Sequence, residues 1–167
     1  QVGGSIPQAR ISPDGRFLVC SVAEYGCFPI FLQSSDLWLV DLQTGEPRRL
    51  AINSDETDSW HCWSSNGRWL VFSSKRGNGL FARPYISYVD AEGTFHKPFV
   101  LPQEDPRFYE SCIMTYNVPE LVTGPVPVRG EELVSLIRTP LETEAVTSAS
   151  PRAEARLQSC AAASRQA

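Results

Sequence analysis

The sequence predicts an all-β fold made of two copies of one four-stranded unit, and three observations carry this prediction. Glycine and proline, which bend a chain most readily, number 11 and 13 among 167 residues. Hydrophobic residues make up 42% of the chain, which is enough for one core. A ten-residue motif that begins at Ser12 recurs at Ser64, and six of its ten positions are identical in the two copies. A repeat of roughly fifty residues with many turns indicates repeated small antiparallel sheets.

Each copy of the motif contains a tight turn followed by a buried strand. Residues 14–15 (Asp-Gly) and 66–67 (Asn-Gly) favour two-residue hairpin turns of the primed type, in which both residues have positive φ, so a strand should end on either side. The apolar runs 17–22 and 69–73 that follow have the β-branched and aromatic content of buried strands.

A second hairpin follows in each copy, because Leu39-Val40-Asp41 in the first copy matches Tyr88-Val89-Asp90 in the second. Turn residues separate the two predicted strands of each hairpin. The predicted strands cover residues 36–42, 47–50, 83–90 and 97–101.

A four-stranded antiparallel meander that repeats at this spacing is the signature of a β-propeller blade. Residues 1–128 are therefore predicted to form a partial β-propeller, with blade one over about 8–51 and blade two over about 59–101. Asp105-Pro106 is a favourable helix start, and it predicts a short closing helix over about 105–117. Rings close with about four to eight blades. We therefore expect an incomplete ring, either the closing part of a larger propeller or a chain that assembles with other copies.

The last part of the chain has a different composition. Every Trp, Tyr and Phe lies between Phe17 and Tyr116, whereas residues 129–167 are rich in Ala, Ser, Thr, Glu and Arg. Such a segment buries too little apolar surface to offset the entropy of ordering it. It is predicted to be a flexible, low-complexity tail, disordered or weakly helical near 131–138 and 152–163.

Charge and composition exclude several classes of function. The formal net charge of −4 argues against nucleic-acid binding by bulk electrostatics. No apolar stretch approaches the roughly 18 to 20 residues that span a bilayer. The five cysteines form no Cys-x-x-Cys pair, so their spacing predicts neither a zinc site nor a complete disulfide framework. We predict no cofactor and no metal, and we expect the cysteines to be single buried thiols.

The first copy resembles the propeller repeat of TolB-like proteins and of related WD-type repeats in bacterial envelope proteins. The resemblance rests on Ser-Pro-Asp-Gly-Arg-Phe-Leu-Val, then Asp-Leu-Trp-Leu-Val-Asp-Leu-x-Thr-Gly, then Arg-Arg-Leu, and it covers about residues 8–101. The second copy departs from the motif at Ser65-Asn66, which stand where the first has Pro-Asp. The resemblance implies a non-enzymatic scaffold that binds a protein partner, in the periplasm or associated with the cell envelope.

Two alternatives remain open at the level of the sequence. The blades could come from the propeller of a larger prolyl oligopeptidase-like hydrolase, which uses similar turns, or from a propeller that binds carbohydrate or another small ligand. The chain has only two histidines and no Gly-x-Ser-x-Gly elbow, so no catalytic residue is assigned and no enzyme activity is predicted.

The resemblance also places one candidate binding rim close to the central channel, where propellers commonly bind partners. The same residues have a structural interpretation as packing between blades and as a solvated hairpin. His61 and Cys62 are adjacent on a predicted strand, so their side chains should point to opposite faces and cannot meet. The rim comprises Asp58, Trp60, His61, Lys75 and Arg76.

Overall fold

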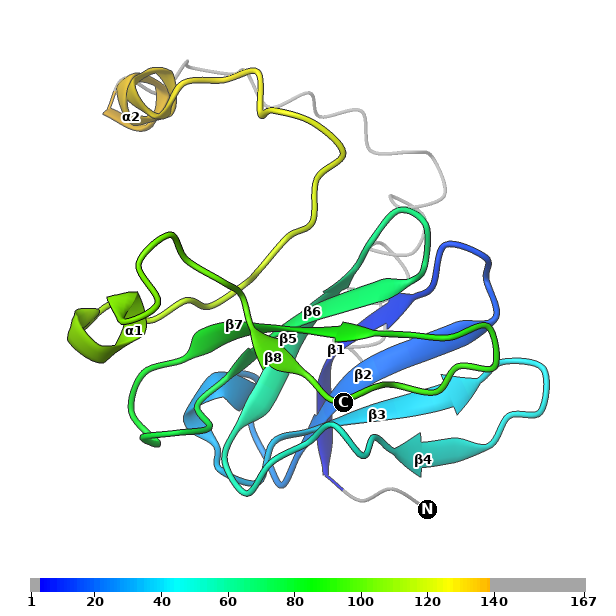
Figure 1. The fold of residues 1–167 in the computed structure, drawn as a ribbon. Coiled ribbons are helices and arrows are strands. Elements are labelled where there is room, and N and C mark those ends of the chain that lie inside the picture. Colours follow the sequence, from blue (N-terminus) through cyan, green and yellow to red (C-terminus); the bar gives the residue numbers. More distant parts are fainter. Residues whose placement is uncertain (1–3, 139–167) are drawn as a thin grey trace, which may run out of the picture. The chain divides into compact units, whose positions relative to one another are not determined.

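The computed structural model describes residues 4–138, and it confirms two four-stranded antiparallel meanders (Figure 1). In each sheet the strands are hydrogen-bonded in sequence order. Sheet A comprises β1 (Ser5–Ile11), β2 (Phe17–Ala23), β3 (Asp36–Asp41) and β4 (Pro47–Arg49), and sheet B comprises β5 (Asp58–Trp63), β6 (Trp69–Ser74), β7 (Arg83–Tyr88) and β8 (Phe99–Val100). A short 3-10 helix, η1 (Pro29–Phe31), lies between β2 and β3.

The chain divides into two compact units, residues 1–125 and 126–167. Both sheets belong to the first unit. In the second unit the described residues form α2 (Gly130–Arg138), which lies where a weak helix was expected. The expected helix at 152–163 and the rest of the predicted tail beyond residue 138 lie outside the described residues.

The serine of the repeated motif closes the turn between the first two strands of each sheet. The Ser12 N–H donates to Phe17 O at 2.7 Å, and the Gly15 N–H donates to Ser12 O at 2.9 Å. The Ser12 hydroxyl accepts the Phe17 N–H at 2.9 Å. Ser64 makes the same three bonds in the second copy, at 2.9, 2.9 and 3.0 Å. The identical positions of the motif therefore build identical turns.

The turn type differs from the predicted primed hairpin. Gly15 and Gly67 have positive φ, but Asp14 and Asn66 do not, since Trp60 is the only non-glycine residue with positive φ among residues 4–138. Instead, one side-chain oxygen of Asp14 accepts both the Ser12 hydroxyl, at 2.5 Å, and the N–H two residues ahead, at 3.1 Å. Asn66 does the same, at 2.7 and 3.0 Å. The Asx side chain selects this turn by its hydrogen bonds and not by tolerating positive φ.

The register of the third strand also differs from the sequence match. Leu39 lies opposite Val19 in sheet A, and Ile86 lies opposite Val71 in sheet B. Because Val19 and Val71 hold the same position in the motif, the counterpart of Leu39 is Ile86 and not Tyr88. The sequence match is therefore displaced by two residues, an even number, so it still assigns side chains to the correct faces.

The closing helix expected over 105–117 is reduced to one turn, α1 (Phe108–Ser111). Asp105 does stabilise its start, because its carboxylate accepts the Arg107 N–H at 2.9 Å. Beyond the turn, the Tyr116 N–H donates to Ala82 O at 3.0 Å, so it is not available for a helical bond. Contacts with sheet B thus replace the continuation of the helix.

One hydrophobic core holds the two sheets together. Its members come from both sheets and are at most 9% exposed: Phe17, Val19, Leu37, Leu39, Leu50 and Ile52 with Trp63, Leu70, Phe72, Val89 and Phe95. Gly93 lies so close to the Phe17 ring that a Cβ on it would stand 2.5 Å from the nearest ring carbon. We call the two surfaces that meet at this core the inner faces of sheets A and B.

We predict that Gly93→Ala destabilises the protein by about 3 kcal/mol or more, because the added methyl overlaps the Phe17 ring and because Gly93 has positive φ. Gly45→Ala is the matched control. Gly45 also has positive φ, but nothing lies within 4 Å of its Cβ position, so only the backbone cost of about 1–2 kcal/mol remains. Urea denaturation of the two variants measures the difference. Equal losses would contradict the predicted contact.

Candidate functional site

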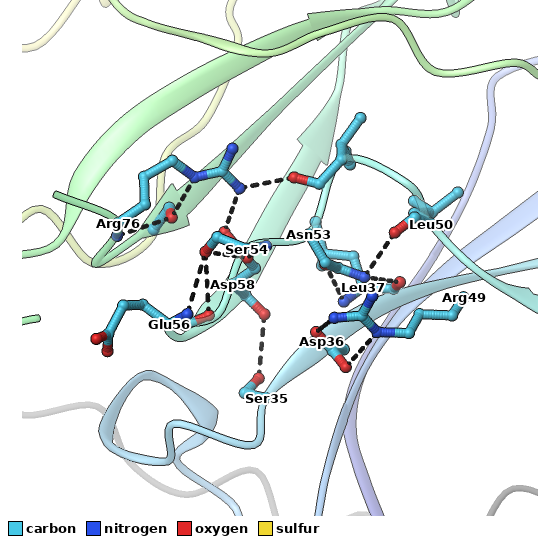
Figure 2. Close-up of polar contacts among 12 residues, drawn as sticks. Ser35, Asp36, Leu37, Arg49, Leu50, Asn53, Ser54, Glu56, Asp58 and Arg76 are labelled. Carbon is cyan, nitrogen blue, oxygen red and sulfur yellow. Dashed lines mark hydrogen bonds and ion pairs between the residues drawn. The ribbon is translucent and has the colours of Figure 1, made fainter.

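The segment between the two sheets is fixed by polar contacts of Asn53, Ser54 and Asp58 (Figure 2). The Asn53 amide bonds both backbone groups of Leu37, at 2.8 Å each, and so continues the pairing along β3 beyond the short strand β4. The Asp58 carboxylate accepts the Ser54 N–H at 2.6 Å and the Ser54 hydroxyl at 2.8 Å. These bonds set the geometry with which one sheet follows the other.

Asp58 and Arg76, two residues of the predicted rim, form an ion pair in this junction. The Asp58 side chain is fully buried, and its Oδ1 lies 2.6 Å from Nη2 of Arg76. The same guanidinium nitrogen donates to Ile52 O at 2.7 Å, and the guanidinium carbon lies 4.7 Å from the Tyr85 ring centroid. These contacts give the pair a structural task, because each of its groups already has partners within the chain.

The other predicted rim residues lie apart from this pair. Trp60 is partly exposed and occupies a bulge in β5 with a φ of 40°. Lys75 is partly exposed, and its Nζ lies 5.4 Å from the Phe31 ring centroid. His61 is fully buried. The structure therefore brings together Asp58 and Arg76 but does not gather the five residues on one surface.

His61 contributes to the contact between the sheets. Its Nε2–H donates to Val19 O of β2 at 2.9 Å, while Nδ1 has no hydrogen-bond partner among the described residues. Cys62 points to the opposite face, as expected for adjacent residues on a strand. Burial, together with the nearby charge of Arg10, lowers the pKa of His61 from 6.5 to about 4.

The long connection between β2 and β3 has both a buried and an exposed part. Pro29 and Ile30 are buried, so this connection covers part of the protein interior. Tyr25, Phe28 and Phe31 are 61–72% exposed on the same connection. Exposed aromatic side chains on a well-held loop are a common feature of recognition surfaces.

The outer face of sheet A, the side turned away from the core, is an apolar sheet surface that is only partly covered. Its side chains are Ala9, Ile11, Leu18, Cys20, Val22, Trp38 and Val40. Cys20 and Val22 are buried, at 4% and 7% exposed, whereas Ile11 is 57% exposed and Leu18 is partly exposed. Their counterparts in the second copy, Trp63 and Leu70, belong to the core and are 7% and 0% exposed.

This difference has a simple cause. The repeat places an apolar side chain at the same position in both copies, but only sheet B has another sheet packed on that side. The outer face of sheet A therefore has the apolar pattern of a surface that packs against another sheet. A strand with one solvent-exposed face shows alternating apolar and polar residues, whereas β2 is continuously apolar. This pattern was the sequence signal that both faces of sheet A are apolar.

Within residues 4–138, no cluster of His, Cys, Asp and Glu has the geometry of a metal site. No helix in this range combines the length and apolar character needed to cross a bilayer. Cys20 and Cys62 are buried thiols, as expected, but Cys27 is exposed. Cys160 lies outside the described residues.

We predict that the stability of the protein falls as the pH is lowered from 6.5 to 4, because the unfolded chain takes up a proton on His61 before the folded protein does. The contribution is complete above pH 6.5 and is lost through this window, and it amounts to about 3 kcal/mol. Urea midpoints across this range measure the loss. His61→Gln should flatten the profile, whereas the exposed-site control His96→Gln should keep it. An unchanged profile in His61→Gln would contradict the assignment.

Comparisons with known proteins add little to this description. No protein-family model matches the sequence, and no curated protein matches it. A crystal structure of the tricorn protease is similar at 19% sequence identity and a TM-score of 0.40, over 61% of this chain and 9% of that chain. The chain thus spans about one tenth of the length of that protease, and so weak a similarity carries no information about activity.

Proposed function

We propose that this chain is a non-enzymatic β-propeller scaffold that binds a protein partner through the outer face of sheet A. The observation that carries the proposal is the unequal burial of equivalent positions. Ile11 is 57% exposed, whereas Trp63, at the same position of the second copy, is 7% exposed because sheet A covers it. A partner that covers Ile11 and Leu18 would remove this difference.

The chemistry of the face indicates what kind of partner fits. The face is apolar along β1, β2 and β3, and its polar edge is an ion pair in which Arg49 Nε lies 2.6 Å from Asp36 Oδ2. An apolar centre with a charged rim is typical of protein interfaces. The partner surface should therefore be a sheet face with aliphatic and aromatic side chains, which is what another propeller blade presents.

The resemblance of the first motif to TolB-like repeats supports an envelope setting for this interaction. We propose a periplasmic or envelope-associated scaffold on that basis. The turn that carries the motif is built in the same way in both sheets, so the two blades are close structural copies at the point on which the resemblance rests.

We predict that Ile11→Asp abolishes partner binding, because it places a charge at the most exposed apolar position that β1, the neighbour of β2, contributes to this face. Leu80→Asp is the matched control, since Leu80 is 69% exposed but lies in the connection between β6 and β7. Purified protein is immobilised, envelope and cytosolic fractions are passed over it, and bound proteins are quantified. A partner from the envelope fraction that wild type and Leu80→Asp retain, and that Ile11→Asp loses at least tenfold, is the expected result. Equal retention by all three proteins would overturn the proposal.

A further inference from the structure

The outer face of sheet B is covered differently from that of sheet A, by a segment of the same chain. Residues 112–123, which we call the strap, follow α1 and run across this face. The Ser73 hydroxyl on β6 donates to Tyr116 O at 2.9 Å and also to Asn117 O. Further along, Leu121, Val122 and Thr123 of the strap face Trp69, Ile86 and Phe99 of the sheet.

Two further anchors hold the strap at its ends. Arg83 is 6% exposed, and its guanidinium donates to Met114 O at 2.5 Å and to Cys112 O. At the other end, the Glu120 carboxylate forms a two-bond ion pair with Arg10 of β1, with one bond at 3.1 Å. The hydrogen bonds of the strap are made by its main-chain groups, and its one ion pair is partly exposed to solvent. Such contacts are weaker than a packed apolar interface.

The repeat shows what the strap replaces. Trp69, Val71 and Ser73 on the outer face of sheet B hold the same motif positions as Phe17, Val19 and Ser21 on the inner face of sheet A. The inner face of sheet A binds sheet B. The outer face of sheet B is therefore built like a surface that binds another blade, and the strap occupies it.

The strap leaves part of this surface bare. A pocket of about 430 Å³ remains between the strap and the sheet, beside Trp69 and Ile86. Their counterparts in sheet A are Phe17 and Leu39, which share one core with Trp63 and Leu70 of sheet B. The first-copy counterparts of Trp63 and Leu70 are Ile11, which is exposed, and Leu18, which is partly exposed.

We infer that the partner of the outer face of sheet A is a second copy of this chain, whose outer sheet B face becomes available when the strap leaves it. Ile11 and Leu18 of one copy then pack on Trp69 and Ile86 of the other, in a head-to-tail contact that repeats the contact between sheets A and B. This inference rests on the proposed function.

A polar contact supports the same arrangement. In the contact between the sheets, Arg16 donates from Nη1 to Ala91 O, in the connection between β7 and β8, at 3.1 Å. Arg68 is the counterpart of Arg16 in the second copy and is exposed. In the proposed contact, Arg68 would donate a hydrogen bond to a turn carbonyl of the second copy. The docking face would then repeat a polar contact as well as the apolar contacts between sheets A and B.

The inference is tested by weakening the contacts of the strap with sheet B and β1 in the full chain. Ser73→Ala with Glu120→Gln removes the hydroxyl donor and the ion pair but leaves the apolar face unchanged. Ser111→Ala with Glu104→Gln is the matched control, because the Ser111 hydroxyl bonds only within α1. Light scattering during size-exclusion chromatography over a range of protein concentrations gives the association constant of each protein, and far-ultraviolet circular dichroism confirms that each is folded.

We predict that the loosened variant self-associates at least tenfold more tightly than wild type and the control. Adding Ile11→Asp should abolish the association. A peptide of residues 112–123 should reduce it in wild type and in the loosened variant by competing for the vacated face. The peptide arm also decides the matter if the loosened variant does not fold.

Two outcomes would overturn the inference: a loosened variant that stays as monomeric as the control, or an association that Ile11→Asp and the peptide leave unchanged. The proposed function is judged separately. If envelope capture remains sensitive to Ile11→Asp while the loosened variant stays monomeric, the scaffold stands and the second copy is not its partner. If Ile11→Asp affects neither measurement, both fail.

Discussion

The structure depends on one constraint: each sheet has two apolar faces, and a pair of sheets can cover only one face of each. The covered pair forms the core, where Phe17, Leu39, Trp63 and Phe72 are at most 7% exposed. Burial of this surface is the main source of stability for a small domain. The two remaining faces differ, since the strap covers the outer face of sheet B and no other sheet within residues 4–125 packs on the outer face of sheet A. The asymmetry between the two copies follows from this arrangement, since equivalent positions are apolar in both copies.

The mutual placement of the sheets is specified by small features around the core. Gly93 allows the Phe17 ring to approach the backbone of sheet B. His61 bonds a carbonyl of β2, and Asp58 and Arg76 fix the segment that leads into β5. Polar groups buried in this way contribute specificity, because any other arrangement of the sheets would leave them without partners. An interface of defined geometry between the two sheets holds their outer faces in fixed positions, which the proposed scaffold role requires.

The sequence was sufficient to predict the two meanders, because the motif recurs with its turn chemistry intact. It was less informative at three points, each with a physical reason. Asp14 and Asn66 shape their turns through hydrogen bonds to their side-chain oxygens, so the Asp-Gly and Asn-Gly dipeptides did not identify the turn type. The helix expected over 105–117 is reduced to one turn, because backbone groups of this segment bond instead to Ala82, Ser73 and Arg83, which are distant in the sequence. The predicted rim residues lie close together in the sequence, but burial and hydrogen bonding determine whether each side chain reaches the surface.

Ile11 and Leu18 were missed as site residues, because an apolar residue in a strand is ordinarily a core residue. They are exposed only because no second sheet packs on their side of sheet A.

The central claim is that equivalent apolar positions differ in exposure only because one copy lacks a neighbour. Carbene footprinting with mass spectrometry tests this directly, since it labels side chains according to their solvent exposure. In dilute solution we predict strong labelling of Ile11, weaker labelling of the partly exposed Leu18 and protection of Trp63 and Leu70. The signals of Ile11 and Leu18 should decline as the concentration of chain or partner rises. Equal labelling of the two sets, or protection of Ile11 and Leu18 at every dilution, would contradict it.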